Sequence, residues 1–233
     1  MSESQIVVLI VLLFYSPVFY HLVLAIKEDR EGVRKVLKRF YRYLKISFLC
    51  LFILLIGTLI ISHTNYFDYE KPIKFERYDQ ITFENFRGIE LFKKSLYGNE
   101  RFAYVVTSID SEIEEDGVVV QSLFHPSRSF VYKKNVFSKE LLSHEKYHFK
   151  ITELYARKAK KEISSIEHID KPQIRNIIRK AKNEENSFQK QYDHDTFHSY
   201  VYSEQNRYEK EIDSMLVLLS DYMNPKVEYH END

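Results

Sequence analysis

Two long apolar runs dominate the N-terminal part of the chain. Residues 6–26 and 46–62 contain no Asp, Glu, Lys or Arg and consist mostly of Val, Leu, Ile, Phe and Tyr. A helix needs about 20 apolar residues to cross the hydrocarbon core of a bilayer. The pattern predicts two transmembrane helices, at about 6–26 and 46–62. A cleaved signal peptide is the alternative for the first run, but residues 1–5 lack the positive charge that precedes such a segment.

The segment between the two runs is basic. Residues 27–45 hold eight Lys and Arg residues against three Asp and Glu, and their apolar positions recur at helical spacing. We therefore expect the later part of this segment to extend the second helix. Short basic segments remain in the cytoplasm. The prediction is a two-pass membrane anchor over residues 1–63, with the remainder, residues 64–233, in the periplasm or outside the cell.

The hydrophobic pattern changes after the second run. A polar, aromatic stretch to about residue 80 has the composition of a linker. Residues 102–113 then alternate between apolar and polar side chains, Asp116 and Gly117 supply a turn signal, and 118–124 is a second run rich in β-branched residues. This order predicts an antiparallel hairpin.

Three helices are expected after the hairpin. Residues 138–166 contain no Pro or Gly, and Ser138 is a suitable N-cap for a helix along them. A second helix should begin near Pro172 and continue to about residue 192, and a third should cover about 203–222. A small antiparallel sheet followed by three helices predicts an α+β fold for residues 64–233.

Composition narrows the chemistry of this domain. The only cysteine, Cys50, falls in the second apolar run, so residues 64–233 contain neither a disulfide nor a cysteine ligand or nucleophile. The chain balances 34 Lys and Arg against 34 Asp and Glu. No basic face remains once the segment between the apolar runs is set aside, so nucleic acid is not an expected partner.

An H-E-x-x-H motif lies in the first of the three predicted helices. His144, Glu145 and His148 are its defining residues. Four residues of helix advance about one turn, so both imidazoles project from one face and the glutamate lies beside them. This is the pattern of a catalytic Zn²⁺ site that carries its own general base. Two exposed histidines on a charged helix would be the purely structural interpretation.

A catalytic zinc ion needs a third protein ligand. The richest source is the connection between the last two predicted helices, where His194, Asp195 and His198 lie close together and Glu204 follows. All four side chains are chemically competent. Spacing alone does not choose among them.

Two other polar residues have structural interpretations. Glu153 is about half a turn away from His144 in helical angle, so it is expected to pair with Arg157 four residues further on. His125 is isolated in the sequence and is expected to be an ordinary packing or surface residue.

Three segments resemble a bacterial family, a domain of unknown function described as predicted secreted zinc-dependent proteases. The resemblance rests on ITFENFRG at 81–88, LLSHEKYHFKITELYAR at 141–157, and YDHDTFH at 192–198 followed by Gln205. It covers most of residues 80–215 in order. It implies a zincin-like fold, His144, His148 and His198 as metal ligands, and Glu145 as the base. It also marks Tyr192 and Asp193 as signature positions without assigning their roles.

The chain departs from the family pattern at two positions. Tyr147 replaces the usual glycine before the second histidine of the motif, where a large side chain could narrow the cleft. Ser199 replaces the usual glycine after His198, where the change could tighten the loop. Neither change removes a ligand.

The functional expectation is a membrane-anchored, zinc-dependent metallopeptidase that hydrolyses peptide bonds of a peptide or protein substrate outside the cytoplasm. Zn²⁺ would be its cofactor, and Glu145 would exchange protons with water and the leaving amine. The alternative is a non-catalytic membrane-anchored module in which the same residues hold a structural metal.

Overall fold

The computed structural model describes residues 3–28, 33–64, 68–88, 103–131, 138–166 and 170–228. The chain divides into two compact units, Met1–Ile61 and Ser62–Asp233. The first unit consists of helix α1 (Glu3–Glu28) and the greater part of helix α2 (Val33–Thr64). The basic segment between the apolar runs is therefore largely helical where it is described.

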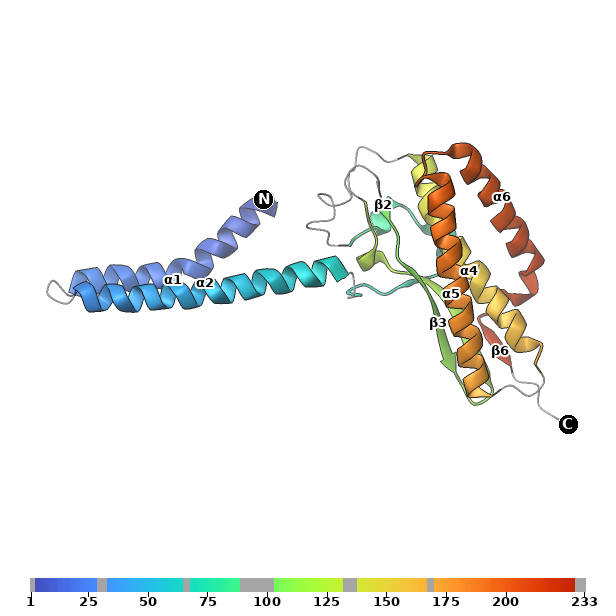
Figure 1. The fold of residues 1–233 in the computed structure, drawn as a ribbon, viewed down its shortest axis with the longest axis horizontal. Coiled ribbons are helices and arrows are strands. Elements are labelled where there is room, and N and C mark those ends of the chain that lie inside the picture. The colour runs from blue at the N-terminus through green and yellow to red at the C-terminus, as the bar shows by residue number, and fades with distance from the viewer. Residues whose placement is uncertain are drawn as a thin grey trace. The chain divides into compact units, whose positions relative to one another are not determined.

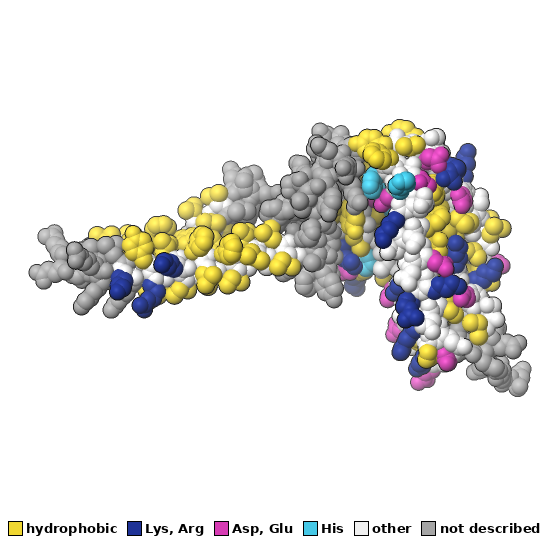
Figure 2. Space-filling view, viewed as in Figure 1, with side chains coloured by type: hydrophobic (Ala, Val, Ile, Leu, Met, Phe, Trp, Pro, Cys, Tyr) yellow, Lys and Arg dark blue, Asp and Glu magenta, His cyan; other side chains and the backbone are white. Residues whose placement is uncertain are grey.

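Only one of the two expected membrane spans is found among the described residues. Phe40–Ile60 of α2 is long and apolar enough to cross a bilayer, with a mean hydropathy of 2.3, and none of it is buried. In α1, the apolar stretch found among the described residues is Val8–Leu24, which is shorter and covers about 25 Å at 1.5 Å per residue. The second span predicted at 6–26 is therefore not found as a candidate span among the described residues. Figure 2 shows hydrophobic side chains over much of the described surface of these helices.

The second unit contains two small antiparallel sheets. In the larger sheet, β4 (Gly117–Phe124) lies between β1 (Ile73–Lys74) and β3 (Thr107–Ile113), and β6 (Lys226–Glu228) also pairs with β4. β2 (Ala103–Tyr104) and β5 (Phe130–Val131) form the smaller sheet. The pairing of β3 with β4 confirms the predicted hairpin.

Three long helices accompany the sheets (Figure 1). They are α4 (Lys139–Ser164), α5 (Lys171–Thr196) and α6 (Tyr202–Leu218). The Ser138 hydroxyl accepts a hydrogen bond from the Leu141 amide at 3.0 Å, as its predicted N-cap role requires. The mixture of helices with small antiparallel sheets is consistent with the predicted α+β class. Short 3-10 helices complete the unit: η1 (Phe75–Gln80), η2 (Phe83–Asn85), η3 (Pro126–Arg128) and η5 (Ser220–Tyr222).

Helix α4 is the centre of the domain. It packs against β3 and β4, and also against α5 and α6. The predicted pair of Glu153 and Arg157 is present at 2.7 Å, with both side chains nearly fully buried. Ser122 of β4 donates to the same carboxylate at 2.6 Å, and Arg157 donates to the Leu216 carbonyl of α6 at 3.0 Å. One ion pair thus connects the helix to the sheet and to its neighbouring helix.

The segment predicted as a linker is part of the folded domain where it is described. Phe75 and Tyr78 of η1 pack against Phe149 of α4, with ring centroids 5.3 and 6.3 Å away. This burial of aromatic area explains why a polar, aromatic stretch is ordered. Asp68 contacts Nδ1 of His125 at 2.9 Å, and Ser108 contacts Nε2 at 2.7 Å. The expectation that His125 is an ordinary packing or surface residue therefore understates its role, because it connects this segment to the sheet.

Candidate metal centre

The two histidines of the H-E-x-x-H motif lie side by side on α4. Their Nε2 atoms are 3.3 Å apart, and their rings are nearly perpendicular. Only 1% of His144 and 8% of His148 are exposed. The i,i+4 spacing on the helix accounts for the pairing. Packing of α5 over this face removes both rings from solvent.

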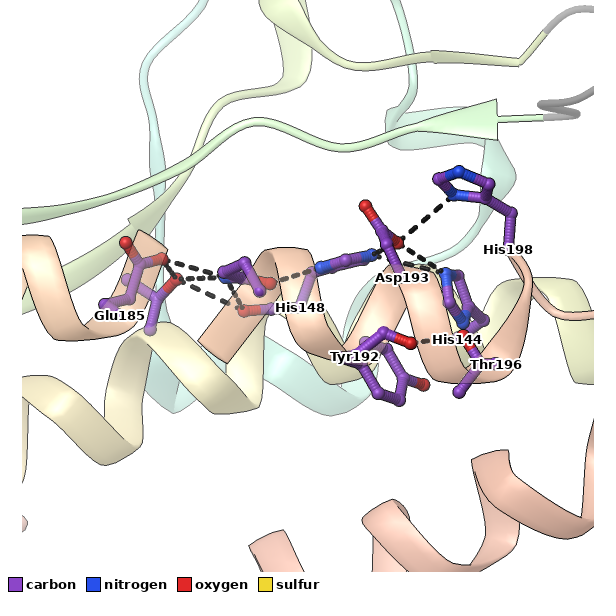
Figure 3. Close-up of polar contacts among 9 residues, drawn as sticks. His144, His148, Glu185, Tyr192, Asp193, Thr196 and His198 are labelled. Carbon is purple, nitrogen blue, oxygen red and sulfur yellow. Dashed lines mark hydrogen bonds and ion pairs between the residues drawn. The ribbon is translucent and has the colours of Figure 1, made fainter. Parts of the chain in front are cut away.

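Asp193 lies at the point where the imidazoles converge. Its Oδ1 atom is 3.2 Å from Nε2 of His144, 3.0 Å from Nε2 of His148 and 3.3 Å from Nδ1 of His198 (Figure 3). One donor atom from each of His144, His148 and Asp193 lies within 4.8 Å of the others. Residues from α4, the last turn of α5 and the turn after it therefore meet around one oxygen atom.

The turn that carries His198 has an unusual backbone. Phe197, His198 and Ser199 all have positive φ angles, of 47°, 50° and 76°. Side-chain-bearing residues rarely adopt this left-handed conformation, and three in succession store strain. Phe197 and Ser199 thus adopt backbone conformations that favour glycine. The turn bends the chain so that the His198 ring faces Asp193.

The Tyr192 ring packs against both histidines of the motif. Its ring stacks on His144 with centroids 4.7 Å apart and meets His148 edge-on at 5.2 Å. Tyr192 is fully buried, and its hydroxyl has no hydrogen-bond partner among the described residues. The ring therefore fixes the plane of His144 by stacking.

Glu145 opens onto the same cavity as the candidate ligands. The cavity has a volume of about 340 Å³ and is lined by Glu145, His148, Asp193 and His198, with the segment 103–107 also forming part of its wall. Glu145 itself is 4% exposed. A carboxylate thus lines the same cavity as the nitrogen-rich cluster.

The buried charges of the cluster shift each other's pKa values. Burial lowers the pKa of His144 to about 4, although Asp193 opposes the change. Burial also disfavours the charged form of His148, but the Asp193 carboxylate outweighs it and raises the pKa of His148 to about 9. Burial tends to raise the pKa of Asp193, yet contact with His148, His144 and His198 holds it far below the usual range. The metal-free cluster therefore contains an imidazolium–carboxylate pair at neutral pH.

Tyr147 contacts α6 and is not among the residues that line the cavity. Its hydroxyl donates to Asp213 at 2.8 Å, and the Lys150 ammonium lies 4.4 Å from its ring centroid. The side chain is 8% exposed and belongs to the main apolar core. The large residue at this position of the motif therefore does not narrow the cleft.

The other ligand candidates have different partners. His194 is 84% exposed and contacts Asp195 at 2.9 Å, and Asp195 also accepts from Tyr208 at 2.6 Å. Glu204 pairs with Arg207 at 2.8 Å. The structure does not bring these three candidates into the cluster. It brings in Asp193 instead, which spacing did not single out and only the resemblance marked.

Comparison of the chain with protein families, curated proteins and solved structures finds no match. The site is therefore interpreted from its own geometry.

The donor set fits a transition metal. Three imidazole nitrogens and one carboxylate oxygen are ligands that suit zinc and related ions, whereas calcium and magnesium prefer oxygen. The Nδ1 atom of His144 is buried and has no partner among the described residues, so its ring is oriented by the Nε2 contacts and by Tyr192. A cation at the convergence point would take the place of the proton shared with Asp193.

The raised pKa of His148 predicts an unusual pH dependence for the metal-free protein. Its pKa is 6.5 in the unfolded chain and about 9 in the fold. Protonated His148 therefore stabilises the folded state. This contribution is fully present below pH 6.5 and is lost as the pH rises through 9. Urea unfolding of the full chain in detergent with a chelator should show a falling midpoint over this range. Asp193→Asn should remove that fall, and an equal fall in this variant would contradict the assignment.

The strained turn predicts a stabilising substitution. Glycine populates positive φ without the steric cost that a serine carries, so Ser199→Gly should raise the free energy of unfolding by about 1 kcal/mol. The same change at Ser214, exposed in the interior of α6, should lower it by about 0.5 kcal/mol. Denaturant titration of both variants measures the contrast. A loss of stability in Ser199→Gly would show that the turn is not strained.

Proposed function

We propose that the Ser62–Asp233 unit is a zinc-dependent metallopeptidase. The observation that carries the proposal is the convergence of His144, His148, Asp193 and His198 beside Glu145 at one cavity. A helix with an H-E-x-x-H motif next to a small antiparallel sheet also agrees with the zincin-like fold that the sequence resemblance implies. The resemblance supports the proposal independently of the geometry.

His144, His148 and Asp193 are the proposed ligands, because their donor atoms lie closest together. His198, which the resemblance favours as third ligand, is more exposed at 26% and contacts Asp193. When bound, zinc would polarise the substrate carbonyl and acidify a water molecule. The residues of the chain hold the ion and keep both imidazoles in fixed planes.

Glu145 is the proposed general base and acid. It accepts a proton from the attacking water and later delivers that proton to the leaving amine. Its position on the wall of the cavity supports this role, since the substrate would lie in the same space. The segment 103–107 also lines the cavity and leads into β3, which lies at the edge of the larger sheet and pairs only with β4 among the described strands. An extended peptide could pair with this edge.

One observation favours the alternative of a structural metal. Four protein donors converge, and a zinc ion with four protein ligands has no open position for water. The non-catalytic module would use all four residues to fasten α5 to α4. Binding and turnover measurements distinguish the two functions.

The proposed location is the outer side of the cytoplasmic membrane. Phe40–Ile60 would supply a span, and the basic segment before it would remain in the cytoplasm. Helix α1 would then be a second, shorter membrane helix, giving a two-pass anchor with the catalytic domain in the periplasm or outside the cell.

Metal analysis tests the ligand set. The full chain in detergent should bind about one zinc ion, and Asp193→Ala should weaken binding by more than about 100-fold, beyond the effect of losing a residue that only orients a ligand. His198→Ala should weaken binding less. His194→Ala is the matched control, since His194 is exposed on the same segment, and it should bind as wild type. Wild-type affinity in Asp193→Ala would exclude Asp193 as a ligand.

Turnover tests the role of Glu145. Cleavage of a peptide library by the zinc-loaded chain should fall by at least about 100-fold in Glu145→Gln, because the substituted amide cannot accept the proton. Zinc content should remain unchanged. Glu140→Gln, in the first turn of the same helix, should cleave normally. Full zinc loading without any cleavage by the wild-type chain would favour the structural metal.

A further inference from the structure

Gln189 of α5 contacts His148 through both ends of its amide. Its Oε1 atom accepts a hydrogen bond from Nδ1 of His148, and its Nε2 group donates to the backbone carbonyl of the same histidine at 2.9 Å. Nε2 also donates to Oε1 of Glu185, one turn earlier on α5, at 2.8 Å. One glutamine therefore holds the ring and the backbone of a candidate ligand together.

The partners of Gln189 fix the direction of its amide. A backbone carbonyl and an ionised carboxylate only accept hydrogen bonds, so the NH₂ end must face His148 O and Glu185. A flipped amide would place its oxygen against two acceptors. Oε1 consequently faces the ring, and because it too can only accept, Nδ1 of His148 must carry the hydrogen. Nε2 of His148 is then the atom left to face Asp193.

Glu185 is itself held in place. The Thr152 hydroxyl donates to its Oε1 atom at 2.9 Å, and the Thr107 hydroxyl lies 2.7 Å from that of Thr152. A hydroxyl carries a single hydrogen. Because that of Thr152 goes to Glu185, the hydrogen between the two threonines comes from Thr107 of β3. A chain of hydrogen bonds thus leads from the sheet through α4 to the carboxylate. Every donor in it points toward Glu185, the acceptor at its end.

The two histidines of the motif differ in the partners of their Nδ1 atoms. The Nδ1 atom of His144 is buried without a partner among the described residues, and stacking on Tyr192 sets its plane. The Nδ1 atom of His148 has a partner, Gln189, whose amide donates to the His148 carbonyl, to Glu185 and to the Thr152 hydroxyl. The fold therefore specifies which nitrogen of His148 carries the hydrogen. For His144, only the contacts of Nε2 bear on this.

We propose that Gln189, oriented by Glu185, is a positioning residue that holds His148 with Nδ1 protonated and Nε2 directed at the metal centre. The proposal rests on the metal site proposed above and adds a residue to which no role had been given. Partners of this kind fix the ring of a ligating histidine, and their loss typically weakens metal binding by about 10- to 100-fold. Gln189 acts through His148, whose ring and backbone carbonyl it contacts.

Metal competition binding on the full chain in detergent tests the proposal. Zinc affinity should fall by about 10- to 100-fold in Gln189→Leu, which removes the acceptor. Gln189→Glu keeps an acceptor for Nδ1 but places its second oxygen against Glu185 and the His148 carbonyl, so its affinity should lie between those of Gln189→Leu and the wild type. Gln191→Leu is the matched control: the same change two residues along α5, where the exposed side chain contacts Asp195. It should leave zinc affinity unchanged, and the visible spectrum of bound Co²⁺ should change only in Gln189→Leu.

The outcomes separate this inference from the proposed function. If the wild-type chain binds no zinc, the proposed metal site itself is wrong. Wild-type binding together with equal affinity in Gln189→Leu overturns only the positioning role. If Gln189→Leu fails to fold, nitrogen NMR of ¹⁵N-histidine in the zinc-loaded wild type decides. A protonated Nδ1 and zinc-bound Nε2 on His148 support the role, and the reverse assignment refutes it.

Discussion

The contact between one carboxylate oxygen and three imidazoles is the interaction on which the site depends. Asp193 belongs to the end of α5, whereas His144 and His148 belong to α4, so the cluster exists only when the two helices are docked. Buried imidazoles close together disfavour each other's protonation, and a nearby negative charge offsets this effect. Oδ1 of Asp193 supplies that balance. The same oxygen faces the cavity that Glu145 lines.

The surroundings of the cluster explain how a small domain tolerates so many buried polar groups on one helix. Helix α4 is covered by the sheet and by two helices, and several of its buried polar side chains have partners on these neighbours. Glu153 and Arg157 neutralise each other between β4 and α6, and Thr152 is shared between β3 and α5. Removing one member of such a buried pair leaves an uncompensated charge, at a cost of about 3–5 kcal/mol. The polar network therefore specifies how the helices dock as well as what they hold.

The sequence predicted what depends on local periodicity. The hairpin, the N-cap at Ser138, the pair of Glu153 with Arg157 and the shared face of His144 and His148 all follow from spacings of two, three or four residues. The contribution of Asp193 depends on how far α5 continues and how it docks, and neither is encoded locally. Tyr147 was expected to affect the cleft, but its direction is set by α6, which lies far away in the sequence. The segment around Phe75 looked like a linker because its aromatic rings are buried by a helix that comes much later.

The pairing of β6 with β4 has a consequence for how the domain is made. Val227 lies opposite Val118 in the ladder, and the Lys226 ammonium contacts Glu114 and Asp116 beside the hairpin turn. The central strand thus remains without this neighbour until residues 226–228 have left the ribosome. By then the helices that complete the cluster have also been synthesised. The larger sheet is therefore completed only after the helices that bring His144, His148 and Asp193 together have been synthesised.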